Sequence, residues 1–75
     1  MSWNYRIVRK VYKVANAQEE IYTIHEAYYY EGKETPYTIT NESLYPTGKT
    51  LEELKADLEH YMEALTKPVL EYDDF

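Results

Sequence analysis

The sequence lacks several features that stabilise or target small proteins. It has no cysteine, so neither a disulfide nor a thiolate metal site can hold this chain of 75 residues together. No apolar run approaches the roughly 18–20 residues of a membrane span. The first ten residues also lack the apolar segment of a signal peptide. The length predicts a single domain, residues 1–75, and the absences predict that it lies in the cytoplasm and not in a membrane.

Phenylalanine is nearly absent, whereas tyrosine is abundant. One Phe and one Trp stand beside ten Tyr. A tyrosine ring can be half-buried while its hydroxyl stays in water. The composition therefore suits a thin domain with one open sheet face.

Basic residues are scarce after the first strand. Residues 1–14 carry four bases and no acid, residues 50–75 carry eight acids and two bases, and the whole chain has a net charge of −6. An acidic chain repels nucleic acid at long range, so we do not expect a nucleic-acid partner. The asymmetry is explained by charge complementarity within the chain, and two different docking faces are the alternative.

Residues 50–67 have the pattern of one amphipathic helix. Apolar side chains recur with a period of about 3.6 residues, at Leu51, Leu54, Leu58, Tyr61, Met62 and Leu65. Thr50 and Glu53 have the spacing of a capping box, and Pro68 ends the helix. Because an isolated helix of this length is marginal in water, we expect the apolar stripe to pack on the rest of the chain or on a second copy.

The N-terminal half predicts three antiparallel strands, at about residues 3–14, 20–30 and 35–41. These segments are rich in β-branched and aromatic residues and alternate in polarity. Residues 16–19 predict the first turn, and Gly32 lies in the second. The expected fold class is α+β, a three-stranded β-meander with the C-terminal helix packed on one face.

The two faces of the middle strand differ in bulk. One set, which we expect to face the helix, consists of Tyr22, Ile24 and Tyr28 together with Tyr5 and Ile7 of the first strand. The contrary set would bury His25 and Ala27. Residues 68–75 form a C-terminal tail, of which residues 69 and 70 are expected to pack back on the domain.

No motif predicts catalysis. His25 and Glu26 are neighbours in a strand and point to opposite faces, so they cannot form an acid–base dyad. Asp57, His60 and Glu63 share one side of the helix, but a single helix offers too few ligands for a metal site. We therefore expect no enzyme, no metal and no cofactor.

Four blocks together resemble a family of short bacterial proteins with no assigned activity. They are WNYRIV at residues 3–8, IHE and YY within residues 24–29, PTGKTLEEL at residues 46–54 and KPVL at residues 67–70. This resemblance implies a fold and not a function. Residues 48–53 are also similar to the start of the helix in HicB-type antitoxins, small β-β-β-α proteins that bind a toxin.

The expected function is a non-catalytic module for protein interaction or self-association. Three strands and one helix leave a sheet face and an edge uncovered, and such a domain gains burial by dimerising or by binding another protein. The alternative is an antitoxin-like regulator that binds a small basic protein through its acidic helix. The candidate contact residues are Trp3, Arg9, Lys13, His25, Tyr29 and Tyr37.

Overall fold

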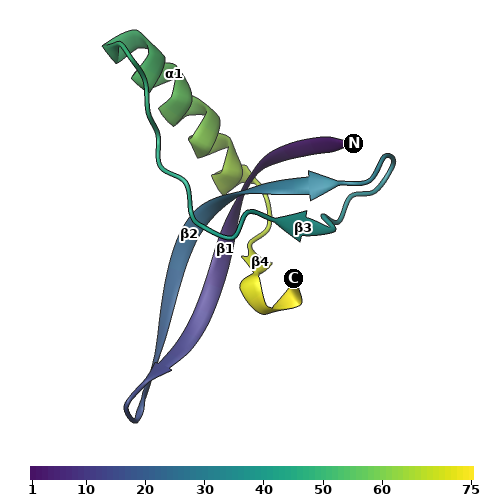
Figure 1. Ribbon diagram of the computed structural model, residues 1–75, viewed down its shortest axis with the longest axis vertical. Coiled ribbons are helices and arrows are strands. Elements are labelled where there is room, and N and C mark those ends of the chain that lie inside the picture. The colour runs from purple at the N-terminus through teal and green to yellow at the C-terminus, as the bar shows by residue number, and fades with distance from the viewer.

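A long antiparallel hairpin forms the centre of the molecule. In the computed structural model, which describes residues 1–75, β1 (Ser2–Val14) pairs along its whole length with β2 (Ala17–Tyr29). Two short strands extend the sheet, β3 (Thr38–Ile39) beside β2 and β4 (Leu70–Glu71) beside β1. The order is β3-β2-β1-β4, and β4 runs parallel to β1 (Figure 1). The α+β class is as expected, but the sheet is mixed and four-stranded.

Helical structure follows the strands. α1 (Leu51–Met62) continues directly into the 3₁₀ turn η1 (Glu63–Thr66). A second 3₁₀ turn, η2 (Tyr72–Asp74), follows β4. None of these helices combines the length and the apolar character that crossing a membrane requires.

The first turn is tighter than predicted. The hairpin turns at Ala15 and Asn16, and β2 already begins at Ala17 opposite Val14. Ala15 has a φ of 56°, the left-handed geometry that a two-residue connection uses. The expectation of a turn at residues 16–19 was wrong because both faces of this tip are exposed, so polar residues there do not interrupt a strand.

The core lies on one face of the sheet, under the C-terminal segment. Its buried side chains are Val8, Ala27, Tyr29 and Ile39, and Leu70 and Tyr72 pack against them. The predicted tail therefore provides a fourth strand and a cover for the sheet. Leu70 packs back as expected, whereas Val69 remains 48% exposed.

The third strand is shorter than predicted, but its hydrogen bonds continue beyond it. The amide of Tyr37 donates to the Tyr28 carbonyl at 2.9 Å, and the amide of Leu44 donates to the Ile24 carbonyl at 2.8 Å. Regular pairing is confined to Thr38–Ile39. Pro36 cannot donate to a ladder, which explains why the strand begins after it.

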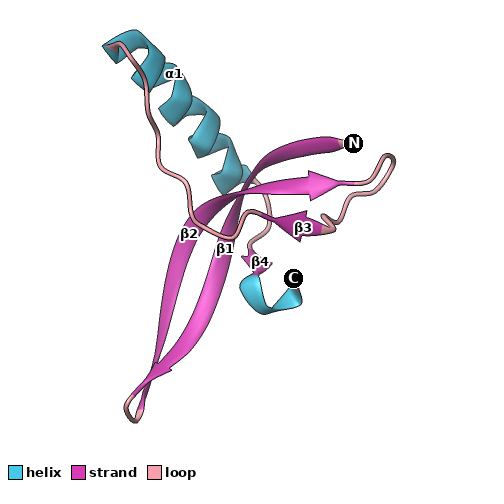
Figure 2. Ribbon diagram, in the orientation of Figure 1, coloured by secondary structure: helices cyan, strands magenta, loops and turns pink.

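The helix does not pack across the sheet, which corrects the predicted arrangement. α1 projects from the sheet as an arm and meets it at its C-terminal end (Figure 1). There Tyr61 is buried, and its ring lies edge-on to Tyr5 with the centroids 4.3 Å apart. The crossover segment, residues 40–50, follows β2 as far as Leu44 and from Tyr45 onward runs beside the helix (Figure 2). An apolar stripe predicts that one face of a helix becomes buried, but it does not identify the segment that buries it. In this chain the crossover segment packs against one side of the stripe.

The result is an open shape. The radius of gyration is 14.0 Å and the extents are 44 × 33 × 20 Å. A compact domain of this length has a radius of gyration of about 11 Å. The arm and the hairpin tip, which project in different directions (Figure 1), account for the difference.

Candidate interaction surface

The start of α1 is fixed by hydrogen bonds to the crossover segment. Thr50 Oγ1 accepts from the Glu53 amide at 3.1 Å, and Glu53 Oε2 accepts from the Lys49 amide at 2.8 Å. Asp57 Oδ2 accepts from the Thr47 amide at 2.8 Å. The predicted capping box is therefore present. The Glu53 side chain accepts from the amide of Lys49, the residue before the N-cap, and not from that of Thr50 itself.

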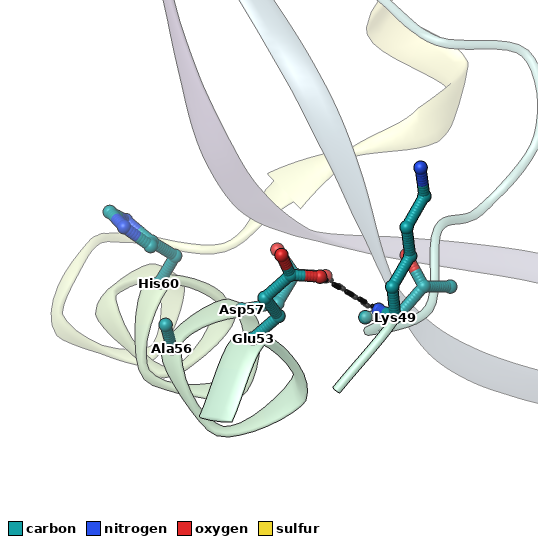
Figure 3. Close-up of a pocket in the computed structure, with 7 residues that line it drawn as sticks. Lys49, Glu53, Ala56, Asp57 and His60 are labelled. Atoms are coloured by element: carbon teal, nitrogen blue, oxygen red, sulfur yellow. Dashed lines mark hydrogen bonds between the residues drawn. The ribbon is translucent and has the colours of Figure 1, made fainter. Parts of the chain in front are cut away.

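These carboxylates line an open hollow of about 560 Å³ between the helix and the crossover segment. Figure 3 shows Glu53 and Asp57 turned toward Lys49. His60 lines the same hollow but lies farther from Lys49, with the two carboxylates between them. Both carboxylates are engaged by backbone amides, so their role is to hold the arm together. No three His, Asp or Glu side chains come close enough together to hold a metal ion.

Most of the apolar stripe faces solvent. We call this part the outer strip, and it consists of Leu51, Leu58, Met62 and Leu65, which are 81%, 44%, 62% and 69% exposed. On the inner side, Tyr61 donates its hydroxyl hydrogen to the Tyr45 carbonyl at 3.0 Å, and Leu54 is half-buried. The inner side binds the crossover segment, and the outer strip stays largely exposed to solvent.

The sheet face opposite the core is also largely uncovered. We call it the open sheet face, and it consists of Trp3, Tyr5, Ile7, Val11, Tyr22, Ile24 and Tyr28. Trp3 and Tyr22 are 53% and 56% exposed, and the others are half-buried. Of the bulky set expected to face the helix, the structure places Tyr5 in contact with it and leaves Tyr22 open.

The contact between Tyr61 of the arm and Tyr5 of the sheet is shielded from solvent, because Tyr61 is buried. Burial, and next the nearby Tyr5, raise the pKa of Tyr61 to about 12. The pKa of Tyr5 is raised as well, by burial and then by the Asp57 carboxylate. Neither phenol ionises near neutral pH, so this contact supports the arm and offers no acid or base.

Arg9 and Lys13, two of the predicted contact residues, differ in their surroundings. The Arg9 guanidinium bridges Glu20 at 2.8 Å and Glu71 at 2.7 Å, tying β2 and β4 to β1. The Arg9 guanidinium also lowers the pKa of Glu20. Lys13 is exposed near the hairpin tip and forms no salt bridge. Lys13 is thus a free cation, whereas Arg9 is already paired.

His25 and Tyr29 lie inside the fold, which corrects their expected place on an open face. His25 is 3% exposed and Tyr29 is 6% exposed. Nδ1 of His25 lies 2.9 Å from the Thr40 carbonyl oxygen, which can only accept, so Nδ1 carries the proton. Nε2 then accepts from the Thr23 hydroxyl at 2.9 Å. Both ring nitrogens are satisfied, and His25 is a core residue.

Trp3 and Tyr37 lie near the surface, as expected. Tyr37 is 40% exposed and stacks on Tyr30, with the ring centroids 4.1 Å apart. Trp3 meets Tyr5 edge-on at 5.3 Å. The six predicted contacts therefore do not form one patch, and only Trp3 belongs to the open sheet face as a large exposed ring.

Sequence reasoning found the residues of the outer strip and expected them to pack on the sheet of the same chain or on a second copy. The width of the stripe could have distinguished the inner side of the helix from the outer strip, because a short crossover segment cannot cover six apolar positions. Comparisons of the chain with protein-family models, curated proteins and solved structures find no match.

Proposed function

We propose that this chain is a non-catalytic protein-interaction module that self-associates. In this proposal the outer strip of one copy packs on the open sheet face of a second copy, and the reverse contact completes a two-fold dimer. A cytoplasmic location is part of the same proposal.

The observation that carries the proposal is the excess of exposed surface. The chain exposes 5932 Å², whereas a folded monomer of this mass exposes about 4,900 Å². The excess of about 1,000 Å² exceeds the roughly 800 Å² that each partner buries in a standard stable interface. A dimer through the two open surfaces would bring the exposed area per chain to the ordinary value.

The charges around the two surfaces support a second copy as the occupant. Glu52 and Glu59 are exposed on α1 next to the outer strip, and neither forms a salt bridge. Lys13 is the free cation near the end of the open sheet face. Two helices side by side would bring these acids of both copies together, whereas packing the strip of one copy on the sheet of the other lets them approach Lys13, on a face that also carries one unpaired acid, Glu26.

The alternative is an antitoxin-like regulator that binds a small basic protein. The unpaired acids of the helix favour this second candidate, because a basic partner would neutralise them. In that case the outer strip contacts the foreign protein and the chain alone stays monomeric. A gene for a small basic protein next to the gene for this chain, and a complex of the two products on co-expression, would support the alternative.

Light scattering over a range of concentrations tests the proposal. We expect a mass of twice the 9.0 kDa chain at high concentration and dissociation on dilution. Leu65→Lys places a charge on the outer strip at a side chain that is 69% exposed, so the chain should fold but remain monomeric. Thr35→Lys is the matched control, because Thr35 is exposed on the β2–β3 connection. A monomer at every concentration would contradict self-association.

A further inference from the structure

Arg6 is the one buried cation of the chain, and no carboxylate accompanies it. The side chain is on the core face of β1, and the residue is 7% exposed. Both salt bridges of the protein belong to Arg9, so no acid lies within 4.0 Å of the Arg6 guanidinium. A charge taken out of water without a counter-charge is unfavourable.

The hydrogen bonds of Arg6 go to neutral acceptors. Nη1 donates to the Tyr29 hydroxyl at 2.8 Å, and Nη2 donates to the Pro68 carbonyl at 2.7 Å. Nε is buried and has no partner. A guanidinium has five N–H donors. Three remain unused: the Nε–H and one hydrogen on each of Nη1 and Nη2.

A cavity of about 330 Å³ lies against this guanidinium. Its walls come from the N-terminal end of β1, from the β2–β3 connection and from the segment after η1, and the first two lie near each other in Figure 1. The charged residues that line it are Arg6, Lys33, Lys67 and Glu34. The cavity thus has three cations and one acid, in a chain with a net charge of −6.

The neutral residues of the cavity add donors and a ring. Tyr29 donates its hydroxyl hydrogen to Asn4 Oδ1 at 2.8 Å, which leaves the amide group of Asn4 free to donate. Trp3 also lines the cavity, and its ring stands on the open sheet face, edge-on to Tyr5. Neither Lys33 nor Lys67 forms a salt bridge, so both ammonium groups are available.

We propose that this cavity binds a phosphate dianion, as free phosphate or as the terminal group of a small phosphomonoester. An arginine fork and two ammonium groups match the charge and the several oxygens of phosphate better than the single charge of a carboxylate. The bound anion supplies the counter-charge that the fold does not provide for Arg6. The binding of phosphate does not depend on the self-association proposed above, although Trp3 belongs to both surfaces, so the titrations below are made at one constant protein concentration.

Fluorescence of Trp3 gives a direct test, because it is the only tryptophan of the chain. The wild-type chain is titrated with inorganic phosphate, with phenyl phosphate and with benzoate at constant ionic strength. We expect a saturable change with both phosphates and none with benzoate. Tighter binding of phenyl phosphate would identify a phosphomonoester as the ligand, and equal binding would identify free phosphate. Equal binding of benzoate would overturn the assignment of phosphate.

Two double variants locate the site. Lys33→Gln with Lys67→Gln removes both surface cations of the cavity, and phosphate binding should weaken about tenfold or more. Lys49→Gln with Lys55→Gln makes the same charge change at the end of the crossover segment and on α1, and should leave the affinity within about twofold. Equal weakening in both would mean general attraction of anions to lysines and would overturn the site, as would the lack of a saturable change at millimolar phosphate.

Both double variants alter exposed side chains, so folding is expected to be intact, and circular dichroism checks it. An NMR titration provides a second readout. Phosphate should shift the side-chain Nε–H signal of Arg6 and the amides of residues 2–6, 33 and 67. Shifts confined to the hairpin tip or the arm would contradict the proposal.

Discussion

Leu58→Ala distinguishes a helix stripe that belongs to the fold from one that belongs to an interface. Leu58 lies in the middle of the outer strip and is 44% exposed in the single chain. Truncation of a fully buried leucine costs about 2–5 kcal/mol. Because nearly half of this side chain is already in water, we expect a loss of only about 1 kcal/mol in a dilute, monomeric sample.

The same substitution should have a larger effect on association. In the proposed dimer each copy buries the remaining part of its Leu58. Removing the two side chains then costs about 1–3 kcal/mol per dimer, which weakens the dimer about 5-fold to 150-fold. Val8→Ala is the matched control, because Val8 is 0% exposed in the core. That change should cost about 2–3 kcal/mol even in the monomer.

Urea unfolding at low and high protein concentration measures both effects. We expect Leu58→Ala to lower the midpoint slightly in the dilute sample and strongly in the concentrated one, whereas Val8→Ala lowers both alike. A loss of more than about 2 kcal/mol for Leu58→Ala at every concentration would refute the reasoning, since it would mean that the helix packs within its own chain.

Three further changes test individual contacts. Tyr29→Phe removes the hydroxyl that accepts from the buried guanidinium and donates to Asn4, so urea unfolding should show a loss of about 1–3 kcal/mol. Gly48→Ala would bring a Cβ against the Leu54 amide nitrogen and within 2.8 Å of the Glu53 carbonyl carbon. The helix start should then shift, with a loss of helical circular dichroism and of about 1–3 kcal/mol. The pKa of Tyr61 is raised from 10.0 to about 12, so the stability that this group contributes is complete below pH 10 and is lost as pH rises toward 12. Alkaline unfolding of Tyr61→Phe should lack this loss, and an unchanged alkaline profile would contradict the assignment.

Local signals in the sequence predicted most of the secondary structure. Alternation located the long hairpin, and Thr50 with Glu53 marked the start of the helix, because these patterns depend on neighbouring residues. The fourth strand was missed because two residues, Leu70 and Glu71, are too few to show alternation. Their place beside β1 depends on pairing with residues about sixty positions earlier.

Tertiary placement was less predictable than local structure. The stripe of α1 shows which side of the helix is apolar, but the same residues suit an intramolecular core and an interface between copies. His25 was assigned to an open face because the opposite set of side chains has more bulk, whereas hydrogen bonds from Thr23 and to Thr40 satisfy His25 inside the fold. The environment of Arg6 could not be foreseen either, since Tyr29 and Pro68 reach it from distant parts of the chain.

The most direct test of the central claim is an intermolecular paramagnetic relaxation measurement. The chain has no cysteine, so Glu59→Cys gives a single site for a spin label on α1, next to the outer strip. The spin-labelled variant, which carries no ¹⁵N, is mixed with ¹⁵N-labelled wild type. We predict broadening of the amides of Ile7, Tyr22 and Ile24 on the open sheet face of the other copy. Broadening confined to other surfaces, or none in a sample whose mass is that of a dimer, would contradict the account.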